Sequence, residues 1–184
     1  MENDVISTIL GRSSIRAYTT EPLTEYQLCE LKKAALASPT AMNRQEQRFI
    51  FVTSPEMLTE LENAIIEGIR LSGDTAFIER MAQRGNTVTY HAPLVVLICS
   101  KPSKFNLVDA GIAVENIAIA AKSMGLDTVI LGMPERAFSS PNGESMKNRF
   151  RFPDGYEFAI AISVGNGAVD KAPHEWDYNH IIAL

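Results

Sequence analysis

The sequence predicts one domain that combines helices with buried strands, and three observations carry this expectation. The length of 184 residues suits one domain better than two, and no linker divides the chain, so we expect a single domain over residues 1–184. Hydrophobic residues make up 46% and charged residues 21%, as in soluble globular proteins. Short apolar runs that suit strands are interspersed with longer segments at helical spacing.

The first half of the chain is expected to contain four helices and one strand. Apolar residues at helical spacing predict a short helix over residues 3–10 with a buried stripe of Val5, Ile6, Ile9 and Leu10, ended by Gly11. The capping-box spacing from Thr24 to Gln27 predicts a helix from about Glu25 to Ala37, which Ser38-Pro39 ends. A strand over 49–52 and helices over 55–71 and 75–84 follow.

The second half is expected to contain three strands around one long helix. A continuous apolar run predicts a central strand over 94–99, and strands are also expected at 128–131 and 158–164. The Ala- and Ile-rich segment from Asp109 to Met124, with Gly125 as its cap, predicts a helix buried in the core or in a dimer interface. Pro134, Pro141 and Asn142-Gly143 indicate loops. The tail after Gly165 is expected to pack through its large apolar groups.

Charge and motif content exclude several functional classes. The net charge of −5 lacks the basic footprint of a nucleic-acid binder, so we expect no nucleic-acid partner. No apolar run reaches the roughly 18 residues of a membrane span, and Cys29 and Cys99 lie far apart without a secretory leader, which favours a cytoplasmic protein without a membrane partner. Dinucleotide, phosphate-loop, zinc and nucleophile-elbow motifs are absent from the sequence, so no metal is expected.

Two polar segments stand out against this background. Arg12-Ser13-Ser14-Ile15-Arg16 carries two guanidinium groups and two hydroxyls within five residues, which are donors that a phosphate dianion requires. A solvated structural loop is the alternative interpretation of this segment. The second segment, from Ser38 to Gln45, lies between a predicted helix and a predicted strand, where loops often carry function. Its Asn43 and Gln45 could instead be turn residues only.

Together these segments resemble the FMN-dependent nitroreductase family, and the resemblance extends over nearly the whole chain. Residues 12–18 are similar to its N-terminal arginine and serine signature, and residues 38–45 to its Ser-Pro-Ser loop with Asn and Gln. The segments 109–124, 125–132 and 162–165 resemble its long central helix, its Gly-Leu-Gly strand and its final strand.

The resemblance implies an α+β fold with a mostly antiparallel sheet flanked by helices, in an intertwined homodimer that holds two FMN molecules at its interface. Arg12, Ser14 and Arg16 would contact the FMN phosphate and ribityl chain, and Ser13 replaces the family's usual second Arg. The isoalloxazine ring would be bordered, from the other subunit, by Pro39, Thr40, Ala41 and Asn43, with Gln45 supporting that loop. The backbone of Gly132 would approach the flavin, and Lys171 and His174 are the available C-terminal cations for the phosphate.

Three further expectations concern positions where the family pattern is weaker. Glu46-Gln47 replaces the family's Pro-Trp and removes an aromatic from near the dimer interface. Arg84 is a possible donor to the N1/O2 edge of the flavin. Met133 is interpreted as a core residue and Trp176 as a packing anchor.

The implied activity is flavin-borne, so no catalytic side chain is assigned. The resemblance implies hydride transfer from NADH or NADPH to FMN and then electron transfer to a nitroaromatic, a quinone or a related small acceptor, with ping-pong kinetics in one open pocket. A non-catalytic flavin-binding or flavin-delivery protein on the same scaffold is the alternative. A cofactor-free dimeric interaction protein is a third hypothesis.

Overall fold

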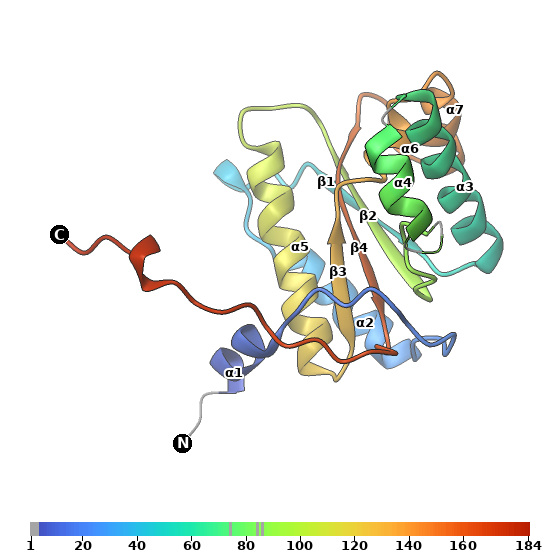
Figure 1. The fold of residues 1–184 in the computed structure, drawn as a ribbon. Coiled ribbons are helices and arrows are strands. Elements are labelled where there is room, and N and C mark those ends of the chain that lie inside the picture. The colour runs from blue at the N-terminus through green and yellow to red at the C-terminus, as the bar shows by residue number, and fades with distance from the viewer. Residues whose placement is uncertain (1–3, 74, 84, 86) are drawn as a thin grey trace.

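A four-stranded sheet forms the centre of the fold in the computed structural model, which describes residues 4–73, 75–83, 85 and 87–184 (Figure 1). Its strands are β1 (Gln47–Val52), β2 (Leu94–Ser100), β3 (Asp127–Leu131) and β4 (Glu157–Gly165). They lie in the order β1-β2-β4-β3, and each neighbouring pair is antiparallel. The predicted antiparallel sheet flanked by helices is therefore confirmed.

Helices cover both faces of this sheet. On one face lie α2 (Glu25–Leu36) and α5 (Asn106–Ser123), while the other carries α3 (Pro55–Leu71), α4 (Thr75–Gln83), α6 (Glu135–Phe138) and α7 (Gly143–Arg149) (Figure 1). Successive residues of β2 alternate between the two cores: Leu94, Val96 and Ile98 pack with α2 and α5, whereas Val95 and Leu97 pack with α3. This explains why all seven residues of β2 are apolar or small and buried.

The local signals for helix boundaries operate as predicted. Thr24 accepts a hydrogen bond from the Gln27 backbone, and the Gln27 side chain accepts one from the Thr24 backbone, which completes the capping box of α2. Ser54 caps α3, whose first residue is Pro55.

Pro134, Pro141 and Asn142 lie in turns, as predicted, but two short helices that the sequence analysis did not predict begin directly after these turns. Pro134 immediately precedes α6, and Gly143 is the first residue of α7. A Cβ at Gly143 would lie 2.1 Å from the Phe138 carbonyl oxygen, so the two helices can approach this closely only with glycine there. The ring of Phe138 stacks on Phe152 with centroids 4.7 Å apart, and this packing stabilises helices that are too short to form alone.

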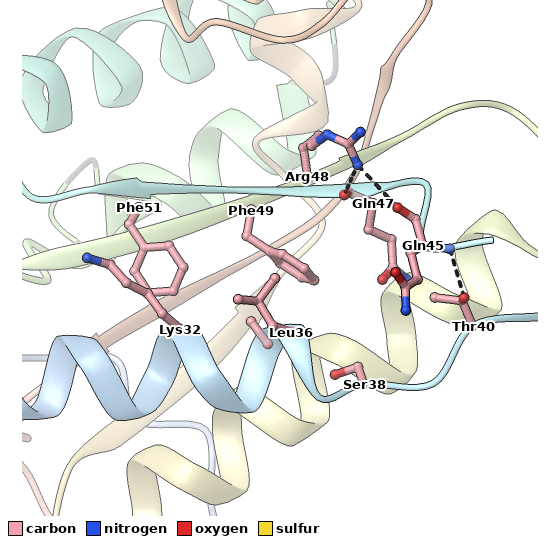
Figure 2. A pocket seen from close by; sticks show the side chains of 10 residues that line it. Lys32, Leu36, Ser38, Thr40, Gln45, Gln47, Arg48, Phe49 and Phe51 are labelled. Atoms are coloured by element: carbon pink, nitrogen blue, oxygen red, sulfur yellow. Dashed lines mark hydrogen bonds between the residues drawn. The ribbon is translucent and has the colours of Figure 1, made fainter. Parts of the chain in front are cut away.

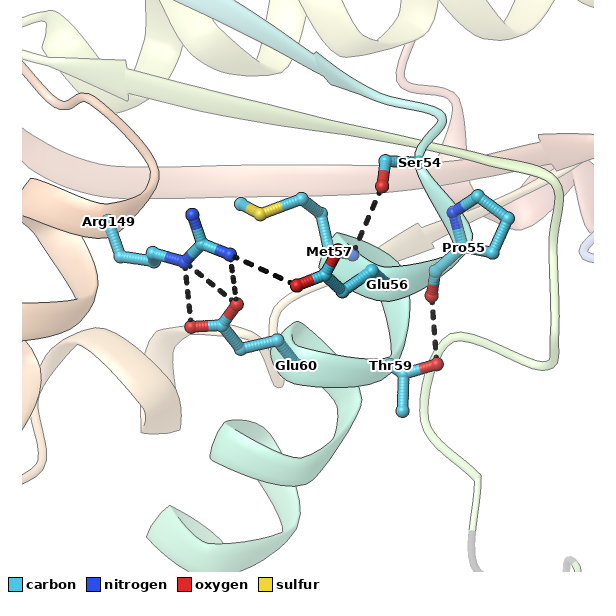
Figure 3. Close-up of polar contacts among 7 residues, drawn as sticks. All are labelled: Ser54, Pro55, Glu56, Met57, Thr59, Glu60 and Arg149. Carbon is cyan, nitrogen blue, oxygen red and sulfur yellow. Dashed lines mark hydrogen bonds and ion pairs between the residues drawn. The ribbon is translucent and has the colours of Figure 1, made fainter.

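Arg149 of α7 forms ion pairs with glutamates of α3 on the same side of the sheet. Arg149 Nε donates to Glu60 Oε1 at 3.0 Å, and its Nη2 lies 2.8 Å from Glu60 Oε2 and 3.9 Å from Glu56 Oε1 (Figure 3). This bidentate contact fixes the orientation of the guanidinium plane.

Two expected burials are not present in the single chain. In α1 (Asp4–Gly11) the predicted stripe is largely exposed, with Val5 at 61% and Ile6 at 51%. The tail beyond residue 168 extends away from the sheet, and its apolar residues are exposed as well: Val169, Trp176, Tyr178, Ile181, Ile182 and Leu184 (Figure 1). Both predictions were wrong for one copy of the chain.

The segment 12–19 is nevertheless fixed beside β3. Ser14 forms a parallel bridge with Thr128, and the Ile15 N–H donates to the Thr128 carbonyl at 3.0 Å. Thr19 N–H donates to the carbonyl of Asn166 at 2.9 Å, and Ala168 N–H donates back to Ala17 at 2.9 Å. The two ends of the chain thus meet at the edge of the sheet, where they carry several of the candidate site residues.

None of the helices in the described ranges has the length and apolar character needed to cross a membrane.

Candidate functional site

The first candidate cluster lies where segment 12–19 passes between β3 and α5. Arg12 Nε is 3.3 Å from Glu115 Oε1 of α5, and the side chains of the two residues are 22% and 40% exposed. Arg16 Nη1 donates to the Ser14 carbonyl at 3.4 Å. Two guanidinium groups are therefore held within one short segment that is itself fixed to a strand.

The C-terminal segment joins this cluster through a serine. Ser13 Oγ donates to the Lys171 carbonyl at 2.8 Å, although residues 13 and 171 are far apart in sequence. His174 is exposed and forms no hydrogen bond or ion pair within the described ranges of the chain. We call Arg12, Ser13, Ser14, Arg16 and Lys171 the arginine cluster.

The second candidate cluster is the loop 38–45, which leaves α2 and reaches β1. Gln45 N–H donates to Thr40 Oγ1 at 3.0 Å, and Gln45 Nε2 donates to Asn43 Oδ1 at 3.0 Å, a geometry consistent with the expected supporting role of Gln45. Met42, Asn43 and Gln45 all have positive φ angles, of 55°, 52° and 52°. Non-glycine residues in this conformation are uncommon and concentrate at functional sites.

Polar side chains on α5 contact both clusters. The sequence analysis did not assign these side chains to the site. Asp109 Oδ1 accepts the Ala41 N–H at 3.0 Å, and Asn116 Nδ2 donates to Ser38 Oγ at 3.0 Å. Glu115 contacts the arginine cluster instead. The available signal was the presence of polar side chains on an otherwise apolar helix, since such residues need partners when they face packed neighbours.

Gly132 lies directly after β3, and the space beside its Cα is open. A Cβ at this position would meet no atom of the chain within 4 Å, and the residue is exposed. The next side chain, Met133, packs against the core that contains α3, in line with its interpretation as a core residue. Arg84 lies outside the described residues.

The two clusters do not contact each other in one chain. Among the described residues, no hydrogen bond or ion pair joins the arginine cluster to the side chains of the 38–45 loop. The single chain therefore presents two separate candidate clusters, both in contact with α5.

A pocket of about 750 Å³ lies between α2 and the edge strand β1. Figure 2 shows Phe49 and Phe51 pointing from β1 toward Leu36 and Lys32 of α2. At the loop end of this pocket are Ser38, Thr40 and Gln45. An edge strand with apolar side chains beside an open pocket is a surface that a further segment can cover.

Comparison with known proteins identifies the family to which this fold belongs. The model of the nitroreductase family matches residues 9–166, so the chain belongs to the nitroreductase family, and the resemblance found in the sequence is confirmed. A crystal structure of a nitroreductase with bound FMN from Desulfitobacterium hafniense superposes with a TM-score of 0.94 at 30% identity, over the full length of both chains.

Two curated relatives are more specific in name. The NADPH-flavin oxidoreductase of Vibrio harveyi is 31% identical over 139 residues, and the FMN reductase (NADPH) of Bacillus subtilis is 30% identical over 145 residues. Each match covers 71% of this chain but only 54% of the relative. The chain thus spans about half the length of these two enzymes, whereas it matches the whole of the Desulfitobacterium chain.

Proposed function

We propose that this chain, as a single FMN-binding domain, is an oxidoreductase that takes electrons from NADH or NADPH and passes them to a nitroaromatic, a quinone or a related small acceptor. The observation that carries the proposal is the arginine cluster: two guanidinium groups fixed beside β3 in a chain of the nitroreductase family. The names of the flavin reductases among its relatives support the same activity.

The donors present fit the phosphate of FMN. Arg12 has one ion-pair partner, Glu115, in the described part of the chain, and a guanidinium has five N–H donors, so several remain for phosphate oxygens. Thr128, which pairs with Ser14, has a buried hydroxyl oxygen without a hydrogen-bond partner in the described structure, so polar capacity is also left beside the cluster. His174 is the weakest assignment, because it has no contact with the cluster.

In this mechanism the residues of the chain bind the FMN and orient its ring. Bound FMN supplies the redox chemistry, since flavins accept a hydride and release electrons. Arg12 and Arg16 would bind the phosphate, and Ser14 would contribute its hydroxyl. The loop residues Pro39, Thr40, Ala41 and Asn43 would border the ring. Asp109 holds the Ala41 N–H, and Gln45 bonds to Thr40 and Asn43. The open space at Gly132 permits close approach of its backbone. One pocket serves both substrates in turn, which predicts ping-pong kinetics.

We also propose that the protein acts as a homodimer in the cytoplasm. The exposed apolar residues of α1 and of the tail support this, because surfaces of this kind mark interfaces. The start of α5 adds Leu107 at 63% and Val108 at 58% exposure. In a dimer, the loop 38–45 of one subunit could complete the arginine cluster of the other, which would explain why the two do not meet within one chain.

The test is the visible absorption spectrum of the purified protein, followed by anaerobic addition of NADH and, separately, NADPH. A flavin spectrum that bleaches with either nucleotide, and recovers when a quinone or nitroaromatic is added, would support the proposal. A flavin that stays oxidised with both would favour the flavin-binding or delivery alternative. A colourless protein that also fails to bind added FMN would overturn the assignment of the cofactor and of its site residues.

A further inference from the structure

The pocket between α2 and β1 combines apolar walls with a buried polar group that lacks a partner. Gln47, Phe49 and Phe51 all line it, and Figure 2 shows their side chains on the α2 side of β1, as expected for alternate residues of a strand. Gln47 is only 8% exposed, and its Nε2 has no hydrogen-bond partner in the described structure. A buried N–H donor without an acceptor is unfavourable, so the pocket favours an occupant that brings one.

The outer edge of β1 favours a peptide as that occupant. β1 pairs with β2 on one side, and no strand within the described ranges pairs with its other side. An unpaired strand edge presents N–H and C=O groups to which an extended segment can add. The volume of about 750 Å³ is sufficient for a large side chain together with the backbone that carries it.

The tail from residue 169 has the complementary features. Its backbone is extended at Asp177 and at Ile181, on either side of the short helix η2 (Tyr178–His180). Trp176 is the only tryptophan of the chain, is 57% exposed, and forms no aromatic pair with the described residues. Aromatic rings bury a large apolar area and pack favourably against each other, so the phenylalanines of the pocket suit this indole.

Charge favours the same pairing. Acidic residues outnumber basic ones in the tail, where Asp170, Glu175 and Asp177 stand against Lys171. The pocket has the opposite character, since Lys32 lines it and its described lining residues include no carboxylate. Lys32 forms no ion pair within the described part of the chain. Complementary charge of this kind steers association and opposes the wrong register.

The course of the tail favours the pocket of another molecule over the pocket of its own chain. The hydrogen bonds from Ser13 to Lys171 and from Ala168 to Ala17 fix the start of the tail beside β3. β3 and β1 are the two opposite edges of the sheet. From β3 the tail extends away from the sheet, so it would have to turn back around the molecule to reach its own β1 (Figure 1).

We propose that the tail of a second copy docks in this pocket, with its Trp176 packed on Phe49 and Phe51. Gln47 Nε2 would donate to a backbone carbonyl of that tail. The inference rests on the proposed homodimer and deepens it, because it names the surface that each tail covers. Residues of the loop 38–45 line one end of the same pocket, so the docked tail would also pack against the loop that is expected to border the flavin ring.

The fluorescence of Trp176 tests the docking, because the chain has no other tryptophan. In the FMN-loaded protein, acrylamide should quench Trp176 weakly in samples that light scattering shows to be dimeric. Leu36→Asp places a carboxylate in the pocket at a position that is 75% exposed, so the protomer should still fold. This variant should raise the dissociation constant of the dimer about tenfold or more, since apolar contact is lost, and should make Trp176 accessible to acrylamide.

The control is Leu71→Asp, which changes a residue that is 56% exposed on α3 and should leave both measurements as in the wild type. A wild-type dimer in which acrylamide quenches Trp176 as strongly as in Leu36→Asp would overturn the docking and leave the homodimer standing. Protection of Trp176 in samples that are monomeric would place the tail on its own chain and would also overturn the proposal. A protein that is monomeric at every concentration, with Trp176 accessible, would overturn the docking and the homodimer together.

A second substitution tests the hydrogen bond from Gln47. Gln47→Leu should raise the dissociation constant of the dimer about fivefold, because one hydrogen bond to the tail is lost. In the Leu36→Asp background, where the dimer is already weakened, Gln47→Leu should not lower the melting temperature, since it replaces an unsatisfied buried amide by an apolar group. An unchanged dissociation constant, together with a lower melting temperature, would mean that Gln47 serves the fold of its own chain and would contradict its assignment to the docked tail.

Discussion

The two ends of the chain differ in a consistent way between their inner and outer parts. The inner parts, residues 14–19 and 166–168, pair with each other and with β3 through backbone hydrogen bonds of 2.9 to 3.0 Å. The outer parts, α1 and the tail from residue 169, present apolar side chains to solvent, including Val5 at 61% and Ile182 at 84% exposure.

One chain satisfies the backbone hydrogen bonds of its two ends, but it does not bury all of their apolar side chains. Backbone groups at the edge of the sheet find partners in the same chain, as buried polar groups must. Apolar side chains of α1 and the tail remain largely exposed in the described chain, and exposed surface of this kind usually marks an interface. We infer that the inner parts help to build the cofactor site. The apolar side chains of the outer parts would be buried against a second copy of the chain.

The largest expected effect tests the arginine cluster, of which Arg16 lies in the inner part and Arg12 directly before it. Arg12→Ala/Arg16→Ala should weaken FMN binding by about 3–6 kcal/mol, because charge-assisted hydrogen bonds to phosphate contribute about 1.5–3 kcal/mol each. The measurement is FMN retained after dialysis, together with the dissociation constant from fluorescence quenching.

Riboflavin provides a control for the same substitution, because it lacks the phosphate. Its affinity should change far less than that of FMN in the double variant. Lys33→Ala/Arg70→Ala, which removes the same charge elsewhere, should retain FMN as the wild type does. An unchanged FMN affinity in Arg12→Ala/Arg16→Ala would refute the phosphate assignment.

The second prediction tests the outer part. Ile181→Ser/Ile182→Ser should weaken dimer formation by about 3–6 kcal/mol for each tail, because a fully buried Ile contributes about 1.5–3 kcal/mol. Both residues are exposed in the single chain, at 68% and 84%, so folding of the protomer itself should be unaffected. Light scattering over a dilution series measures the change.

A matched substitution separates interface burial from a general loss of apolar surface. Leu71→Ser changes a residue that is 56% exposed at the end of α3 and should leave the dimer intact. If the isoleucine variant has the same mass as the wild type at every concentration, the tail does not contribute to an interface.

The sequence predicted the sheet and the long helices because their signals are local. The capping box of α2 and the continuous apolar run of β2 specify their own structures. The turns predicted at Pro134 and Asn142 are present, but the short helices α6 and α7 that follow them were not predicted, since packing around Phe138 rather than a local pattern stabilises them. The burial of α1 was predicted from its apolar stripe, but a stripe does not say which molecule covers it.

Only those candidate site residues that belong to sequence motifs were predicted. The segment 12–16 and the loop 38–45 were both chosen as candidates, and their roles toward FMN stay predictions. The hydrogen bond from Ser13 to Lys171 joins residues that no local pattern relates. The same holds for Asp109 and Asn116, whose partners lie in the loop on another element. Long-range polar contacts of this kind require the fold before they can be seen.

The third prediction measures how firmly the inner part is fixed. Tyr18 Oη donates to the Ile15 carbonyl at 2.8 Å and lies 3.4 Å from the Ser163 carbonyl, so it links segment 12–19 to β4. Tyr18→Phe removes this hydroxyl and should lower the free energy of unfolding by about 1–2 kcal/mol. Urea denaturation measures the loss, and Tyr26→Phe is the control because Tyr26 is 68% exposed. A loss in the control as large as that in Tyr18→Phe would contradict the role of the Tyr18 hydroxyl.

The smallest expected effect concerns alkaline pH and the same tyrosine. Burial, and then the nearby Asp127 carboxylate, raise the pKa of Tyr18 above its ordinary value near 10. Above pH 10 the unfolded chain therefore loses a proton that the folded chain keeps, so the stability present below pH 10 falls as the pH rises.

Between pH 9.5 and 10.5 this linkage should cost the wild type about 0.7 kcal/mol more than Tyr18→Phe. Burial also raises the pKa of the Cys99 thiol, to about 12, but this contribution is common to both proteins and cancels in the difference. Unfolding free energies of the two proteins at several pH values provide the measurement. Parallel pH profiles would mean that Tyr18 ionises equally easily in the folded and unfolded states, which would contradict the tight enclosure of segment 12–19.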